Sequence, residues 1–305
     1  MINLEKFKNV FVAFYTPYDD DGDVSPERTK ALVDYFYSKG IRGLYITGSS
    51  GESPYLNVEE RKTIMKSAME SAKGKMTVIA HVGAASTRDS IILAKYAKEL
   101  ECDAISSVPP IYFSLSEQAI SDYWTAMIEA SQLPFIIYNI PQTTGTNISK
   151  KLFKSMLQNE LTIGIKNTSL PVMDIQQFKE IGGERCIVFN GPDEQFAAGR
   201  LMGADGGIGG TYGVMPELFL KIDEFIRKGD FKHASELQRI TTGLIFEILA
   251  AGGMFGACKY ILKLRGMDIG EPRGPLPKLT KENKRTVEQL EQKISNVIHD
   301  WCDKN

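Results

Sequence analysis

The 305-residue sequence lacks the features that mark several large classes of protein. No run approaches the roughly 18 uninterrupted apolar residues of a membrane-spanning helix, and the segment from Met1 to Lys8 lacks an apolar core followed by a small-residue cleavage site. Charge of either sign is not in excess, since 36 basic side chains face 38 acidic ones. We therefore expect a cytoplasmic protein that binds neither nucleic acid nor a membrane.

Metal-binding and disulfide motifs are also missing. The four cysteines, at positions 102, 186, 258 and 302, form no CxxC pair, and their wide spacing argues against a zinc site or a disulfide framework. The three histidines, His81, His233 and His299, are too scattered to form a ligand set. We expect reduced, buried cysteines and no metal. His81 ends a predicted strand, where a packing role is favoured over catalysis because no partner stands beside it.

What the chain does contain is an alternation of short apolar runs and longer segments of helical period, without a linker. Eight runs are predicted strands: Val10 to Tyr15, Gly43 to Thr47, Met76 to His81, Ala104 to Val108, Phe135 to Tyr138, Thr162 to Lys166, Cys186 to Asn190 and Gly206 to Gly209. Seven helices are predicted between them: Pro26 to Ser38, Val58 to Ala72, Thr87 to Leu100, Glu117 to Ser131, Lys150 to Gln158, Val172 to Ile181 and Glu194 to Met202. Ser25, Asn57 and Ser116 are predicted N-caps.

This repeat predicts an α/β fold, a parallel (β/α)₈ TIM barrel spanning residues 1–228, whose working residues lie at the carboxyl ends of the strands. After Pro216 only helical segments follow: Glu217 to Lys228, Phe231 to Ala251, Gly256 to Arg265 and Lys281 to Asp300. The first completes the barrel, and residues 229–305 form a C-terminal helical extension. The apolar stripe of Leu237, Ile240, Leu244 and Ile248 predicts packing or assembly rather than a cofactor site.

Lys166 is the least expected polar residue in this arrangement, because it ends the apolar run that begins at Leu161. A lysine emerging from a buried strand has few waters around it. Desolvation disfavours the charged form, and a neutral amine attacks a ketone to form a Schiff base. The alternative is a lysine whose ammonium reaches the surface or pairs with a carboxylate, and the run alone favours that alternative.

Polar residues at the ends of other predicted strands fall at the same rim. The turn Gly48-Ser49-Ser50-Gly51-Glu52 offers small residues and backbone amides to a carboxylate or phosphate, although such turns are common in any loop. Tyr112 and Tyr138 follow or end two strands and each alone fits a packed aromatic residue. Asp193 and Glu194 either accept hydrogen bonds from substrate hydroxyls or simply begin a helix.

Taken together, these segments resemble the N-acetylneuraminate lyase and dihydrodipicolinate synthase family of class I, Schiff-base aldolases. The resemblance covers essentially the whole chain and includes the 48–52 turn, Tyr138-Asn139-Ile140-Pro141, Gly164-Ile165-Lys166, the 28-residue interval from Tyr138 to Lys166, and the 203–209 segment. It implies a catalytic lysine at Lys166 and contacts from Ser49 and Ser50 to the pyruvate carboxylate, with Tyr112 as the tyrosine that some members lend across a subunit interface. We expect Tyr138 to transfer the proton as part of a relay with the catalytic hydroxyls of Ser49 and Tyr112. The resemblance also implies a homotetramer.

Two motifs distinguish the branches of this family. Synthases that join pyruvate to aspartate semialdehyde carry an arginine two residues after the proline of the tyrosine motif, whereas this chain reads Pro141-Gln142-Thr143 and lacks that bidentate carboxylate clamp. The lyases use a Gly-x-Asp-Glu turn for the polyol tail, and this chain has Gly191-Pro192-Asp193-Glu194. The resemblance therefore implies reversible cleavage of N-acetylneuraminate to pyruvate and N-acetylmannosamine, through a covalent imine and without a cofactor.

The implied substrate-binding residues also include Thr168, Gly191, Gly209 and Gly210. Gly210 stands where a serine commonly contacts the glycerol-like end, so one sugar contact is missing. Another pyruvate-dependent aldolase, a synthase or a 2-keto-3-deoxy sugar acid aldolase, therefore stays open as an alternative. A phosphate-binding barrel enzyme using the 206–210 loop and a non-catalytic sugar-acid binder are less favoured: the glycines lack a basic neighbour, and binding alone needs neither Lys166 nor Tyr138.

Overall fold

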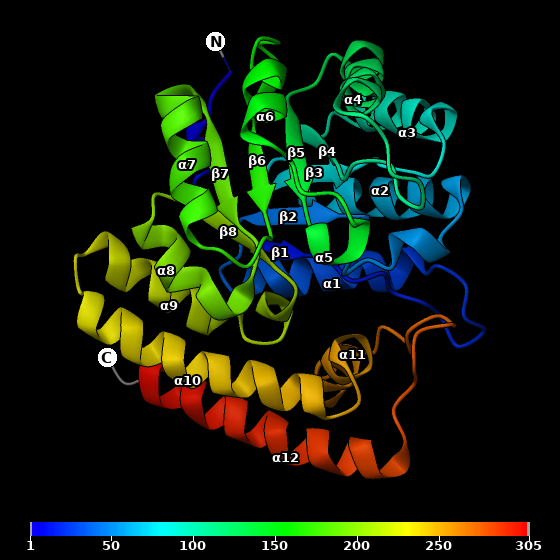
Figure 1. The fold of residues 1–305 in the computed structure, drawn as a ribbon. Coiled ribbons are helices and arrows are strands. Elements are labelled where there is room, and N and C mark those ends of the chain that lie inside the picture. The colour runs from blue at the N-terminus through cyan, green and yellow to red at the C-terminus, as the bar shows by residue number, and fades with distance from the viewer. Residues whose placement is uncertain (1, 304–305) are drawn as a thin grey trace.

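The computed structural model describes residues 2–303, in which eight parallel strands form a closed barrel (Figure 1). Each strand pairs with the next in sequence, and β8 closes on β1 through the pairing of Val10 with Gly207. The strands are β1 (Val10–Ala13), β2 (Gly43–Ile46), β3 (Thr77–His81), β4 (Ala104–Ser107), β5 (Phe135–Asn139), β6 (Thr162–Asn167), β7 (Ile187–Asn190) and β8 (Gly206–Gly209). The predicted barrel is confirmed, and its active rim is where these strands end.

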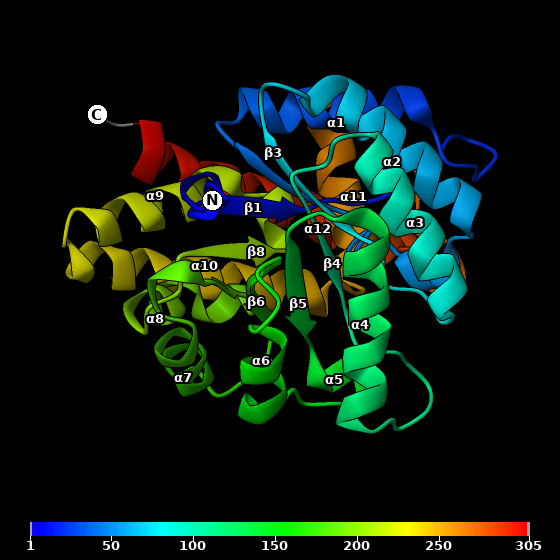
Figure 2. The same ribbon diagram turned by 90° about the horizontal axis from the view of Figure 1, so that it is seen from above.

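Helices surround the barrel (Figure 2). They are α1 (Pro26–Ser38), α2 (Val58–Ala72), α3 (Thr87–Glu99), α4 (Glu117–Ser131), α5 (Pro141–Thr144), α6 (Lys150–Met156), α7 (Met173–Gly182), α8 (Phe196–Leu201) and α9 (Pro216–Arg227). Three begin at the predicted N-caps: the side chains of Ser25, Asn57 and Ser116 each accept a hydrogen bond from the third helical amide. Several helix ends lie one or two residues from their predicted positions, and two other details differ. The one-turn helix α5 was not expected, and α8 begins later because Asp193–Gln195 forms a 3₁₀ turn.

Two apolar clusters hold the barrel together. The inner one fills the barrel with inward-facing side chains such as Phe11, Tyr45, Ile136 and Phe189, and the outer one packs the helices on the strands. Neighbouring residues along a strand face opposite sides, so the two clusters divide each strand between them. Tyr138 belongs to the inner cluster, which places its side chain inside the barrel at the rim.

A register irregularity in β6 aims Lys166 at the same interior. Thr162 pairs with Phe135, but Gly164 pairs with Ile136, so the bulge adds one residue to β6. A one-residue shift moves every later side chain to the other face of a strand. As a result Lys166 pairs with Tyr138, and both residues occupy equivalent positions of adjacent strands.

Replacing Gly164 should destabilise the barrel at this point. A Cβ atom at position 164 would lie 2.0 Å from the carbonyl oxygen of Ile187 on β7, so β6 and β7 must separate to accept Gly164→Ala. We expect a loss of about 1–3 kcal/mol of unfolding free energy, the usual effect of overpacking, measured by urea denaturation. Gly183→Ala is a poor control because its φ is positive, whereas Gly243→Ala, with open space around it, should cost little. Equal losses in the two variants would contradict this account of β6.

The C-terminal extension packs on the barrel beside the carboxyl ends of β7 and β8. Its helices are α10 (Phe231–Ala250), α11 (Met254–Leu264) and α12 (Lys281–Ile298), with α10 and α12 running side by side (Figure 1). Leu237, Leu244 and Ile248 are buried, so the predicted packing role of this stripe is confirmed. Between residues 2 and 303 no single helix is long and apolar enough to cross a bilayer, and only the pair α10 and α11, bent by 106°, meets that test together.

The predicted division at residue 228 falls in the turn between α9 and α10. These two helices pack directly against each other, and α11 also contacts the 3₁₀ turn that follows β8. The division into a barrel and an extension therefore stays a prediction, and the extension forms part of the surroundings of the rim.

Candidate active site

Lys166 and Tyr138 meet inside the barrel mouth. The Lys166 side chain is buried, and its Nζ lies 4.0 Å from the centroid of the Tyr138 ring and 4.6 Å from that of Tyr45. Within residues 2–303, no carboxylate lies within ion-pair distance of this nitrogen and no hydrogen bond ties it down. The surface or ion-paired lysine considered from the sequence is therefore wrong, and the amine is presented to the interior of the mouth.

Two neighbours fix the position of the Tyr138 ring. Tyr45 on β2 meets it edge-on at 5.8 Å, and His81 on β3 does so at 6.2 Å. Tyr45 was not expected from the sequence as part of the site. Its hydroxyl donates to Ser106 Oγ at 3.0 Å, and burial raises the pKa of Tyr45 well above its ordinary value. Tyr45 is thus a rigid wall rather than a proton carrier.

His81 is a packing residue, as the sequence favoured. Its Nδ1 donates to the carbonyl oxygen of Thr47 at 3.1 Å, and its Nε2 accepts from the amide of Val108 at 3.3 Å. Burial, together with the nearby Arg61 guanidinium, holds the pKa of His81 well below its ordinary value. A neutral ring with both nitrogens engaged by the backbone is a support for Tyr138, not a base for substrate.

The turn after β2 fits an anion. Its backbone closes on itself, because Gly51 and Ser53 donate to the Gly48 carbonyl at 3.1 and 3.2 Å and Glu52 donates to that of Ser49 at 3.0 Å. The amides of Ser49 and Ser50 donate to no acceptor in the described part of the chain. Successive free amides in a tight turn form a concave anion site, and this one begins directly after the strand that carries Tyr45.

Glycine is required at the start of this turn. A Cβ atom on Gly48 would lie 2.5 Å from the Tyr45 ring, so the backbone of the turn approaches the wall of the site as closely as it can. Thr47, just before it, adopts a left-handed backbone with φ of 54°. Thr16, in the loop after β1, holds the other end of the turn, because its hydroxyl donates to the Gly51 carbonyl at 2.6 Å.

The two carboxylates after β7 differ in their surroundings. Asp193 is buried, and its Oδ2 accepts from the amide and the hydroxyl of Thr211 at 2.7 and 2.6 Å. Burial raises the pKa of Asp193 to about 6, against the lowering effect of those hydrogen bonds and of Lys166. The Glu194 side chain is half-buried and has no protein partner within residues 2–303. Glu194 is therefore the more available acceptor.

Three of the glycine and threonine positions expected in the site pack closely together around these carboxylates. A Cβ atom on Gly209 would lie 2.4 Å from Asp193 Oδ1, and one on Gly191 would lie 1.9 Å from Thr168 Oγ1. The Thr168 hydroxyl oxygen is buried without a hydrogen-bond partner, which is costly unless a ligand supplies one. The ends of β6, β7 and β8 thus converge on one side of the mouth.

Gly210 lies beside the thioether of Met254 and lacks the hydroxyl of the serine that is common at this position in the family. A Cβ atom there would lie 3.0 Å from both Met254 Sδ and Ser50 Oγ. Met254, the first residue of α11, was not expected in the site. It occupies the space beside Gly210, so a serine at this position would crowd both neighbours.

Tyr112 does not join the other predicted catalytic residues within the chain. Its side chain is 92% exposed, with its ring against Phe113 at a centroid distance of 4.9 Å. No hydrogen bond links Tyr138 to Ser49 or Tyr112 in the described residues, so the predicted proton relay is not formed within one chain. Exposed Ile111, Phe113 and Leu115 accompany Tyr112 in the same loop.

No group of three or more His, Cys, Asp or Glu side chains in residues 2–303 is arranged to hold a metal ion. Cys102, Cys186 and Cys258 are buried free thiols, as predicted, and Cys302 is partly buried.

Comparison with known proteins places this geometry in context. Residues 6–294 match the model of the dihydrodipicolinate synthetase family. The chain is 48% identical over 300 residues to an N-acetylneuraminate lyase of Mediterraneibacter gnavus, covering 97% of this chain and 95% of that protein. The structure of wild-type Ruminococcus gnavus sialic acid aldolase superposes with a TM-score of 0.96 at 46% identity, covering 97% of this chain and 99% of that one. A dihydrodipicolinate synthase of Bacillus anthracis gives 0.90 at 27% identity, covering 96% and 99%.

Proposed function

Because this chain belongs to the dihydrodipicolinate synthetase family of lysine Schiff-base aldolases, we propose that it cleaves N-acetylneuraminate reversibly to pyruvate and N-acetylmannosamine. The observation that carries this function is the buried Lys166 amine, which has no carboxylate partner in residues 2–303 and faces Tyr138 on the adjacent strand. The far higher identity to the lyase and the sialic acid aldolase than to the synthase supports the choice of substrate.

The reaction needs an electron sink on the carbon next to the bond that breaks. The Lys166 amine adds to the C2 ketone of the open-chain sugar acid, and water leaves to give a cationic imine. Loss of the C4 hydroxyl proton forms the aldehyde of N-acetylmannosamine, and the electrons of the C3–C4 bond move to C3, giving an enamine stabilised by the imine nitrogen. Protonation of C3 and hydrolysis by water then release pyruvate and restore the amine.

The side chains of the mouth divide this work. The free amides and hydroxyls of Ser49 and Ser50 hold the pyruvate carboxylate, which fixes the keto carbon near Lys166. Tyr138 moves the proton between the C4 hydroxyl and C3, because its hydroxyl has no protein partner in residues 2–303 and its ring is held in place. The imine supplies the electron sink, so the proposal requires no cofactor.

The polyol tail lies toward the ends of β6, β7 and β8. We assign its hydroxyl contacts to Glu194, Asp193 and the unpartnered Thr168 hydroxyl. Gly191 and Gly209 let these groups approach one another. Met254 beside Gly210 gives the far end of the tail an apolar contact in place of a serine hydroxyl.

Binding of the sugar should weaken as the pH falls through about 6. The pKa of Asp193 is raised to about 6 in the folded protein, so its carboxylate is present above that pH and is protonated below it, losing acceptor strength. We expect the KM for N-acetylneuraminate to rise below pH 6, while the pyruvate concentration that half-saturates imine formation stays level. In Asp193→Asn the KM should be higher than in the wild type and should not change with pH over the same range. Pyruvate release measures both proteins. A wild-type KM that does not change with pH would contradict the role of Asp193.

The runner-up function is condensation of pyruvate with aspartate semialdehyde. The fold is compatible with it, but α5 carries Gln142 and Thr143 on its exposed side, and Thr143 occupies the position where the synthases carry their arginine. A panel of N-acetylneuraminate, 2-keto-3-deoxygluconate and aspartate semialdehyde decides between the alternatives. Our proposal expects pyruvate release from N-acetylneuraminate, and turnover with only one of the other two compounds would refute it.

The proposal extends to a cytoplasmic homotetramer in which Tyr112 approaches the site of a neighbouring subunit. The exposed apolar loop from Ile111 to Leu115 supports a buried contact there. Light scattering of the purified protein tests the assembly, and Tyr112→Ala should weaken it or lower turnover.

A further inference from the structure

We propose that a second buried lysine, Lys259 of the C-terminal extension, positions the carboxylate-binding turn through an ion pair with Glu52. This inference rests on the function proposed above, because it assigns the substrate carboxylate to the turn Gly48–Glu52. Lys259 lies on α11, whereas Glu52 is the last residue of the turn that carries Ser49 and Ser50. The extension then has a role in substrate binding.

The pair is sealed from solvent. Lys259 Nζ lies 2.7 Å from Glu52 Oε1, and the two side chains are 1% and 0% exposed. The same nitrogen donates to the carbonyl oxygens of Thr16 at 2.8 Å and Glu271 at 3.3 Å. Lys259 thus joins the loop after β1, the turn after β2 and the loop after α11 at one point.

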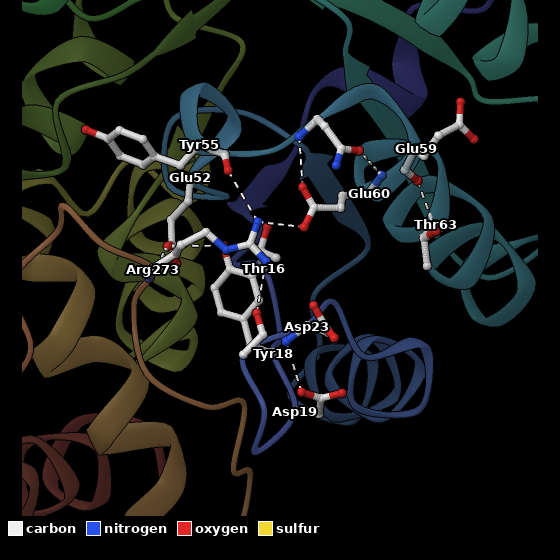
Figure 3. Close-up of polar contacts among 12 residues, drawn as sticks. Thr16, Tyr18, Asp19, Asp23, Glu52, Tyr55, Glu59, Glu60, Thr63 and Arg273 are labelled. Atoms are coloured by element: carbon white, nitrogen blue, oxygen red, sulfur yellow. Dashed lines mark hydrogen bonds and ion pairs between the residues drawn. The ribbon is translucent and has the colours of Figure 1, made fainter.

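The other carboxylate oxygen of Glu52 is also held by the extension. Oε2 accepts from the backbone amide of Arg273 at 2.8 Å and from the Tyr18 hydroxyl at 3.2 Å (Figure 3). The Arg273 guanidinium in turn donates to Glu60 at 2.6 Å and to the carbonyl oxygens of Tyr55 and Gly22 at 3.3 and 2.9 Å. The loop between α11 and α12 is therefore bound to the turn, to the segment that follows the turn and to the loop between β1 and α1.

The backbone of the turn explains why such a clamp is useful. Glu52 has a φ of 58°, a left-handed conformation that a residue with a Cβ atom adopts reluctantly. A non-glycine residue keeps a left-handed backbone conformation only where several surrounding contacts enforce it. Such strained residues are frequent in ligand-binding turns. Fixing the Glu52 side chain fixes the geometry that leaves the amides of Ser49 and Ser50 free.

Comparison of the two buried lysines separates their roles. In the described part of the chain Lys166 has aromatic rings and no carboxylate beside it, whereas Lys259 has a carboxylate and two carbonyl acceptors. A buried ion pair is a weak source of stability compared with apolar packing, but it fixes one geometry. Lys259 is accordingly a positioning residue rather than a second nucleophile.

The test is the double substitution Glu52→Gln and Lys259→Met, which removes both charges and keeps the side-chain volume. Either single substitution would leave the other charge buried without its partner, which is strongly destabilising. Methionine is preferred to alanine because Lys259 also borders a cavity of about 450 Å³ with Tyr18, Tyr260 and Arg273, which truncation would enlarge. The matched control is Lys263→Met on the same helix, which removes an exposed pair with Asp268.

Two measurements are made on each protein. Borohydride trapping over a pyruvate titration gives the half-saturating concentration and the maximal fraction of adduct. We expect the double variant to need about 10- to 100-fold more pyruvate with its maximal adduct near that of the wild type, while Lys263→Met behaves as wild type. Hydrogen exchange without ligand should be faster for the 48–53 amides of the double variant only.

An unchanged half-saturating concentration in the double variant, or unchanged exchange in the turn, overturns the proposal. If the wild type forms no adduct, the proposed function fails, and the exchange measurement still decides whether the pair positions the turn. If Lys263→Met changed the half-saturating concentration and the exchange equally, the pair of Lys259 and Glu52 would only stabilise the extension in general. That result would also overturn the proposal.

Discussion

Lys166→Met is expected to abolish turnover of N-acetylneuraminate while the barrel stays folded. Methionine keeps the length and apolar stem of the side chain, and the space between the Tyr138 and Tyr45 rings suits a thioether as well as an amine. Only the nucleophile is lost. Because no other group in the proposed mechanism can form the imine, we expect kcat/KM to fall by about 10³-fold or more, measured by coupled pyruvate detection.

The same variant provides its own structural control. Its unfolding midpoint should match or exceed that of the wild type, because the substitution puts an apolar side chain in place of a buried amine that has no carboxylate partner among residues 2–303. Lys259, although buried, is committed to Glu52 and should not restore activity. Residual turnover within tenfold of the wild type would show that imine formation at Lys166 is not the chemistry.

Tyr138→Phe should lower kcat and leave substrate binding largely intact. The substitution preserves the ring against Lys166, Tyr45 and His81 and removes the hydroxyl alone. Loss of a positioned proton-transfer group costs about 10²–10⁴-fold in rate, so kcat should fall by that factor with KM changed only a few-fold. Steady-state kinetics on N-acetylneuraminate measure the split.

The matched control for this prediction is Tyr45→Phe. Tyr45 also lies against Lys166, but its hydroxyl is occupied by Ser106. We expect a change of less than tenfold in kcat. If the two phenylalanine variants lost activity equally, the effect would belong to the aromatic wall as a whole, and Tyr138 would not be the proton carrier.

The barrel was predictable from the sequence because the signals for each strand and each helix are local, independent of one another and consistent with the same fold. Each strand is a short apolar run between polar turns, and the N-caps Ser25, Asn57 and Ser116 mark helix starts by side-chain hydrogen bonds that need no tertiary structure. The positions of Lys166 and Tyr138 followed from strand ends meeting at one rim. Their contact is confirmed by the pairing of β5 with β6.

Features that depend on contacts between distant segments were not predictable in this way. The bulge before Gly164, which turns Lys166 inward, depends on how β6 meets β5 and β7. Lys259 lies within an ordinary helical pattern, and only its approach to Glu52, across most of the chain, shows that it is buried. Tyr112 remains a prediction, since its proposed role requires a second subunit.

The central claim is that Lys166 forms an imine with the keto acid. The most direct measurement is sodium borohydride reduction of the protein in the presence of pyruvate, followed by peptide mass spectrometry. The account predicts one reduced pyruvate adduct, on the peptide containing Lys166, and none on that containing Lys259. Absence of any adduct, or an adduct elsewhere with Lys166 unmodified, would contradict it.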